Sequence, residues 1–154
     1  MKGLIDQSMD YLADVQNTYA VLKDMSANKA LTTSSAKIPL ITFSGANCSL
    51  SSNGIKVAKG GVYTVCASVY LGDSFTANDI VHIVINANST EVVHEQIRVH
   101  NAGAWTTYST DNVIVTLNAG DVVYLYAYNQ TGARGNVVRS SATRCPILTL
   151  NRIA

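Results

Sequence analysis

Residues 121–129, Asp-Val-Val-Tyr-Leu-Tyr-Ala-Tyr-Asn, decide the fold expected for this chain. Successive side chains of a strand point to opposite faces, so Val123, Leu125 and Ala127 share one face. The other face carries one valine and three tyrosines: Val122, Tyr124, Tyr126 and Tyr128. A strand in a two-layer sandwich needs only one buried face, and the aliphatic face suits the core. Tyrosine is favoured at protein interfaces, so we predict that this face, Val122 included, contacts other copies of the chain in a trimer. A surface ladder that only supports cross-strand pairing is the alternative.

The same β pattern extends from residue 38 to the C-terminus. Short runs rich in Val, Ile, Thr and Tyr alternate with Gly, Asn and Asp. We predict strands over residues 38–44, 55–58, 62–71, 79–87, 91–99, 105–109, 112–117, 121–129 and 145–152, with tight turns at Asn86–Ser89 and Asn118–Asp121. No helical period appears among these runs, so we expect a mainly β fold, an antiparallel jelly-roll sandwich.

Residues 4–25 show a helical period instead. Placing Ile5 at position a of a heptad gives an apolar seam at Ile5, Leu12, Val15, Tyr19 and Leu22. Such a seam favours a coiled coil of three or more strands, and a helix lying on its own domain is the alternative. The polar segment 26–37 indicates a linker. We therefore assign residues 1–30 to a helical arm for anchoring and trimerisation, 31–37 to a linker and 38–154 to the head.

Composition narrows the range of functions. Hydrophobic residues make up 47% of the 154 residues and charged residues only 14%, which favours surface buried between subunits. Net charge is +1 and no basic run occurs, so we expect no nucleic-acid partner. No apolar stretch approaches the ~18 residues of a membrane span, so we expect no membrane insertion. No signal peptide is visible, so we expect synthesis in a host cytoplasm and three reduced cysteines.

Three motifs point to a known superfamily. Ile55 stands five residues before Gly61-Val62-Tyr63-Thr64-Val65, the segment 117–125 reads Leu-Asn-Ala-Gly-Asp-Val-Val-Tyr-Leu, and Ile-Leu-Thr-Leu follows at 147–150. Together they resemble the globular heads of complement component one-q and the wider tumour necrosis factor-like jelly rolls. The resemblance implies a jelly roll that assembles as a tight trimer. A short coiled coil before such a head also resembles fibres and receptor-binding proteins of tailed bacteriophages.

No pattern of catalytic residues is visible. The histidines lack a His-x-His pair, the cysteines lack a Cys-x-x-Cys pair, and neither a nucleophile elbow nor a phosphate loop occurs. We therefore expect a protein that is not an enzyme and uses no cofactor or metal. Two polar loops supply candidate contacts to a receptor or glycan: Asn101, Trp105, Asn129, Gln130 and Arg134.

The expected function follows from these parts. We expect a homotrimeric structural protein of a bacteriophage virion, either a head fibre or decoration or a tail-tip receptor-binding protein. Its arm would attach to another virion protein, and its head would face a cell-surface glycan. The alternative is a soluble bacterial jelly roll that binds a ligand or signals.

Overall fold

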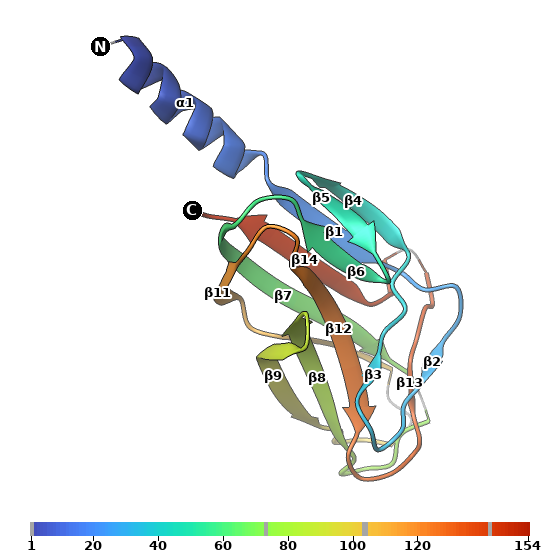
Figure 1. Ribbon diagram of the computed structural model, residues 1–154. Helices are drawn as coiled ribbons and strands as arrows, with labels where there is room; N and C mark the ends of the chain where they lie inside the picture. Colours follow the sequence, from blue (N-terminus) through green and yellow to red (C-terminus); the bar gives the residue numbers. More distant parts are fainter. Residues whose placement is uncertain (1, 73, 103–104, 142) are drawn as a thin grey trace.

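The structure is a two-layered β sandwich with a helix projecting from one end (Figure 1). It is a computed structural model, which describes residues 2–72, 74–102, 105–141 and 143–154, and side chains from residue 5 onward. Helix α1 (Lys2–Gln16) leads into the sandwich. The strands of the described residues are β1 (Tyr19–Lys23), β2 (Lys29–Ala30), β3 (Ala36–Lys37), β4 (Thr42–Ala46), β5 (Cys48–Ser51), β6 (Gly54–Val57), β7 (Gly61–Leu71), β8 (Ile80–Ala87), β9 (Thr90–Arg98), β10 (Thr106–Ser109), β11 (Val113–Leu117), β12 (Val122–Asn129), β13 (Asn136–Val137) and β14 (Ile147–Arg152).

These strands form two antiparallel sheets. Sheet A has the order β2-β13-β7-β14-β1-β4, and both β10 and β11 also pair with β7. Sheet B has the order β5-β6-β12-β8-β9, and β3 pairs with β12. β12 therefore lies in the interior of sheet B, where it pairs with β8 from Val123 opposite Ala87 to Asn129 opposite Val81.

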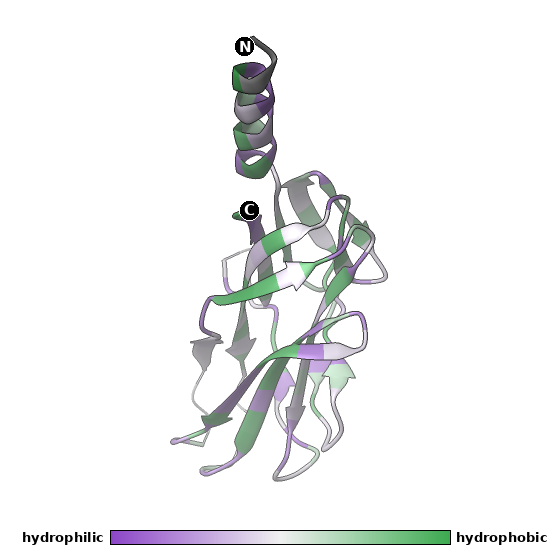
Figure 2. Ribbon diagram, turned by 60° about the vertical axis from the view of Figure 1, so that its left-hand side comes forward, coloured by the Kyte–Doolittle hydropathy of each residue, from purple (hydrophilic) through white to green (hydrophobic). Residues whose placement is uncertain are grey.

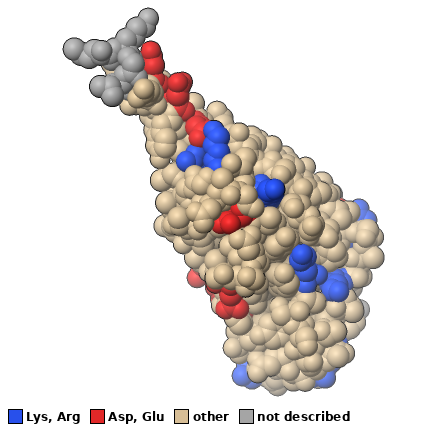
Figure 3. Space-filling view, in the orientation of Figure 1, with Lys and Arg blue, Asp and Glu red and all other residues tan. Residues whose placement is uncertain are grey.

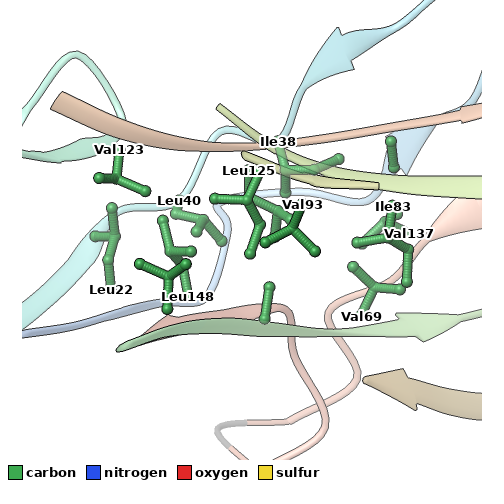
Figure 4. Close-up of a cluster of buried hydrophobic side chains, with 14 of the residues drawn as sticks. Leu22, Ile38, Leu40, Val69, Ile83, Val93, Val123, Leu125, Val137 and Leu148 are labelled. Atoms are coloured by element: carbon green, nitrogen blue, oxygen red, sulfur yellow. The ribbon is translucent and has the colours of Figure 1, made fainter. Parts of the chain in front are cut away.

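The core lies between the two sheets. Leu22 and Leu148 of sheet A point toward Val123 and Leu125 of sheet B (Figure 4). Ile38 also enters this layer. The aliphatic face of β12 is thus buried as its period-two pattern predicts, since Val123, Leu125 and Ala127 are fully buried. Cys48, Cys66 and Cys145 form no disulfide in the described part of the chain.

Most of the predicted strands are confirmed. Eight of the nine appear with ends shifted by at most two residues, and both predicted turns occur. Asn88 and Gly120 in these turns have φ angles of +54° and +91°, which suits the residues that most readily adopt left-handed backbone. The ninth prediction, residues 38–44, is partly wrong. The buried residues Ile38 and Leu40 lie outside any strand, and β4 begins at Thr42.

The helix prediction is wrong beyond Gln16. β1 lies between β14 and β4, so Tyr19 and Leu22 belong to a strand and not to a helical seam. Leu22 is fully buried in the core, while Tyr19 is 43% exposed on the outer surface of sheet A. Residues 19–25 fit period two as well as the helical period, and burial between the sheets outweighs the weak local preference for helix.

The boundary between arm and head also differs from the prediction. The expected linker supplies β2 and β3, which pair with β13 and β12. Leu31 between them is only 2% exposed. The head therefore begins at β1 and not at residue 38. Two-residue strands are too short to leave a periodic signal in the sequence.

Candidate functional site

Helix α1 forms a stem with two distinct sides. Ile5, Met9 and Leu12 are 66%, 63% and 53% exposed, and their spacing puts them on one stripe. Asp6, Asp10 and Asp14 recur every four residues on the opposite side, and Figure 3 shows acidic side chains running along the stem. Polar and apolar residues likewise alternate around the helix in Figure 2. A helix of 15 residues with so much apolar surface in water is marginal alone, so this stripe is a candidate contact surface.

Asp14 braces the base of the stem against the head. Its carboxylate accepts hydrogen bonds from Lys59 Nζ and from Arg152 Nη1, the latter at 2.7 Å. Thr18 Oγ1 donates to the Asp14 carbonyl at 2.7 Å, which closes the helix. The hydrogen bond from Lys59 is the main cause that lowers the pKa of Asp14 below its ordinary value of 3.8, and Arg152 adds to it. The ion pairs of Asp14 with Lys59 and Arg152 are therefore complete at neutral pH and are lost as the pH falls below 3.8.

We expect the carboxyl carbon of Asp14 to titrate below pH 3.8 in an NMR experiment. Lys59→Met removes the main hydrogen bond and should raise the midpoint, whereas Lys56→Met should leave it unchanged, because no contact joins Lys56 to Asp14. A wild-type midpoint at or above 3.8 would show that the ion pairs at the base of the stem do not form.

The tyrosines of β12 lie on the outer face of sheet B, as predicted. We call this the tyrosine face: Tyr124, Tyr126 and Tyr128 with His82, Val84, Asn86 and His94 from β8 and β9. The tyrosine rings are half-buried by neighbours in the same chain. Lys37 Nζ lies 3.8 Å from the centre of the Tyr124 ring, and His82 stacks on Tyr128 at 4.3 Å. The predicted contact of this face with another copy stays a prediction.

Two histidines on this face are joined by a hydrogen bond. His82 Nδ1 lies 2.7 Å from His94 Nε2, and His82 Nε2 lies 2.7 Å from Gln130 Oε1. His94 Nδ1 lies 2.9 Å from Glu91 Oε1. No sequence motif indicates this chain of contacts, although the hairpin turn after Ala87 places both histidines on one face. Among the described residues, no group of three His, Cys, Asp or Glu side chains is arranged to hold a metal ion.

The outer face of sheet A is almost uncharged. We call it the neutral face: Tyr19, Val21 and Lys23 of β1, Val62, Thr64, Cys66 and Ser68 of β7, Ile114 of β11, and Ile147, Thr149 and Asn151 of β14. Lys23 is the one charged residue among these. Ile114 is 66% exposed. A cleft of about 240 Å³ lies on this face beside Cys66 and Thr149, whose Sγ and Oγ1 atoms are 2.8 Å apart. Depletion of charge is typical of the core of an interface.

Four of the five candidate receptor or glycan contacts come from loops at the end of the head opposite α1, and Asn129 is the last residue of β12 at the same end (Figure 1). Trp105 is 48% exposed and tilts against Tyr70 at 5.7 Å, and Asn101 is exposed. Gln130 is exposed but bonded to His82. Asn129 is wrong as a contact, because its side chain is fully buried and its Nδ2 donates to Asp79. Residues 103 and 104 of the first loop lie outside the described residues.

Asp79 is a buried carboxylate that ties these loops together. Arg134 donates to it from Nη2 at 2.5 Å and from Nε at 2.9 Å. The Thr76 amide donates to Oδ2 at 2.9 Å, and the Val99 amide donates to the Asp79 carbonyl at 2.8 Å. Burial alone would raise the pKa of Asp79, but the hydrogen bonds from Arg134, Thr76 and Asn129 outweigh it and keep the pKa below 3.8. Arg134 is thus mainly a structural partner and less a free contact residue.

We expect Asp79→Ala to destabilise the protein by about 2–3 kcal/mol, since it removes the acceptor of the Thr76 amide and one of the two acceptors of the buried Asn129 amide. The ion pair with Arg134 contributes little of this free energy, because the Arg134 side chain is 40% exposed and water screens its charge. Urea unfolding measures the change. Asp111→Ala, at an exposed aspartate, is the control and should stay within ~0.5 kcal/mol. Equal stability of the two variants would contradict the role of Asp79.

A cavity of about 220 Å³ opens beside this cluster. It is lined by Leu71, Phe75, Val99, His100, Asn101, Thr106 and Tyr108. Gly135, with φ +82°, lets the Phe75 ring approach the backbone, since a Cβ atom there would lie 2.2 Å from the ring. The cavity is thus formed between the end of β7, the start of β10 and the segment that follows β9.

In the described part of the chain, no helix has both the length and the apolar character that crossing a bilayer requires.

Two antiparallel sheets around one core, preceded by a helical stem, define the class of protein as a jelly roll with a stem. Neither a protein-family model nor a curated protein matches the chain. Solved structures do match, among them the structure of Eiger TNF from S. frugiperda, with a TM-score of 0.64 and 17% sequence identity over 89% of this chain and 92% of that one. At this identity the likeness shows the fold alone. The head has a tumour necrosis factor-like jelly-roll fold, which confirms that part of the resemblance.

Proposed function

We propose that this protein is a non-enzymatic homotrimer of a bacteriophage virion, whose stem attaches to another virion protein and whose head is exposed for binding. The observation that supports association is a pair of surfaces that no other described residue of the chain covers. One is the apolar stripe of the stem, from Ile5 to Leu12, and the other is the neutral face of sheet A. Such surfaces mark sites of association.

One symmetry axis can serve both surfaces. Only Asn17 and Thr18 separate α1 from β1, and β1 lies inside sheet A next to β14. If the apolar stripes of three stems meet at an axis, each β1 enters its head close to that axis. Sheet A is then the layer nearest the other copies, and sheet B is the layer farther out. We therefore place the trimer contacts on the neutral face.

The tyrosine face is the second candidate for the trimer contact. Its three rings could be buried against another copy, as the sequence predicts. Two features speak against it. Its rings already pack on Lys37 and His82 of the same chain, and Lys56, Glu91 and Arg98 on the same sheet would lose water on association. On the proposed arrangement this face points outward and is free to bind a ligand.

The virion assignment is tested on purified particles. Mass spectrometry should find the chain in particles released from cells that carry the gene, at a copy number divisible by three. Its restriction to the soluble fraction of uninfected bacteria would overturn the assignment and favour the alternative, a bacterial jelly roll that binds a ligand or signals. Light scattering of the purified protein tests the trimer separately.

A further inference from the structure

The cavity at the end of the head opposite the stem combines an apolar floor with an uncharged polar rim. Leu71, Phe75 and Val99 are almost fully buried and form the floor. His100, Asn101 and Thr106 stand on the rim, and the Tyr108 ring closes one side. No Asp, Glu, Lys or Arg is among the described residues that line it. The lining therefore suits a neutral ligand that has both an apolar face and hydroxyl groups.

The polar groups of the rim are available to a ligand. Among the described residues, none accepts or donates a hydrogen bond with the side chains of His100, Asn101 or Thr106. An imidazole, an amide and a hydroxyl group supply both donors and acceptors. Placed around an apolar floor, they match a pyranose ring, whose C–H face packs on hydrophobic side chains while its hydroxyl groups form hydrogen bonds.

The size of the cavity sets the size of the ligand. Its volume of about 220 Å³ is below the ~300–1,000 Å³ of pockets that take drug-sized ligands. One sugar ring fits this volume, and a disaccharide would extend from the cavity into solvent.

The site is held in shape by the Asp79 cluster. The Val99 amide donates to the Asp79 carbonyl, and the Asn78 amide donates to the Val99 carbonyl at 2.7 Å. Phe75 packs against the backbone of Gly135, next to Arg134, which pairs with Asp79. Because these contacts already hold the floor of the cavity in place, ligand binding does not have to pay the entropy of ordering it, and the binding free energy is more favourable.

We propose that this cavity binds a single neutral pyranose ring of a surface glycan. The proposal rests on the exposed head of the proposed function and names the ligand class of that head. It places Asn101 in direct contact with the sugar. Trp105 lies outside the cavity lining, and Gln130 and Arg134 bond to His82 and Asp79 instead.

The NMR chemical shifts of the Leu71 and His100 amides provide the measurement, because both residues line the cavity and neither is changed in the variants below. The full-length protein is titrated with the methyl glycosides of glucose, galactose, mannose and N-acetylglucosamine, and with N-acetylneuraminic acid as an anionic sugar. At least one neutral glycoside should give a saturable change with a Kd of roughly 0.1–10 mM, which corresponds to a binding free energy of a few kcal/mol. Asn101→Ala and Thr106→Val should each weaken that binding about tenfold, as loss of one hydrogen bond predicts.

Asn118→Ala is the matched control, because Asn118 is an exposed turn asparagine at the stem end of the head. Its Kd should equal that of the wild type. The inference is overturned if no neutral glycoside binds saturably, if both rim variants bind like the wild type, or if N-acetylneuraminic acid binds most tightly. Light scattering on the same samples separates the two proposals: a trimer that binds no sugar contradicts only the sugar site, and a monomer that binds sugar contradicts only the trimer.

Discussion

Deletion of residues 1–30 should abolish folding of the head, whereas deletion of residues 1–16 should leave it folded. The longer deletion removes β1 from its place between β14 and β4, and with it the buried side chains of Leu22 and Met25. Truncating one buried Leu or Met to Ala typically costs about 2–5 kcal/mol. Loss of both, together with the pairing on two strand edges, matches or exceeds the ~5–15 kcal/mol that stabilises a domain.

The shorter deletion removes only α1 and the Asp14 brace, and it spares the core. Circular dichroism and urea unfolding distinguish the two products. The protein without residues 1–16 should unfold cooperatively but no longer attach to particles, since the stem makes that contact in our proposal. A cooperative transition for the protein without residues 1–30 would mean that β1 is dispensable. Attachment without the stem would assign anchoring to the head.

Ile114→Asp should dissociate the trimer, and Tyr126→Asp should not. Ile114 is 66% exposed in the single chain, so a carboxylate there is solvated in the monomer and does not disturb its fold. In the trimer that we propose, the same carboxylate would be buried at the neutral face of each copy. An unpaired buried charge costs on the order of 3–5 kcal/mol, which weakens each contact by at least a hundredfold.

Light scattering at micromolar concentration should give about three times 16.4 kDa for the wild type and one chain for Ile114→Asp. Circular dichroism of both variants confirms that they are folded. Dissociation by Tyr126→Asp together with a trimeric Ile114→Asp would move the interface to the tyrosine face, as the sequence first predicts. A monomeric wild type would contradict both assignments.

The strands of the head could be predicted because their side chains alternate over many residues. In β12 the tyrosines alternate with core residues, and burial alternates in the same way along most of the long strand β7. β1 could not be predicted, because Tyr19–Lys23 follows an amphipathic helix with no Gly or Pro between them and also fits the period of that helix. Pairing with β4 and with β14, which is more than a hundred residues away in the sequence, decides its state.

The candidate contacts could be predicted only in part, for a similar reason. Asn101 and Trp105 are polar or aromatic loop residues, and the structure leaves them exposed. Asn129 has the same loop character in the sequence, but it is the last residue of β12 and bonds to Asp79. Asp79 and Arg134 are far apart in the sequence, so no local pattern of residues predicts that they form an ion pair. The cavity likewise joins residues of three separate segments.

The Asp79 cluster has a consequence for how the tip of this protein could change over time. The carboxylate of Asp79 holds Thr76 and Arg134, and its backbone carbonyl holds Val99, so one buried residue joins three neighbouring loops. Exposed positions such as Asn101 can therefore be exchanged at a cost that is usually within ~0.5 kcal/mol of stability. A head built in this way can acquire a new binding specificity by single substitutions of exposed loop residues, while its framework stays unchanged.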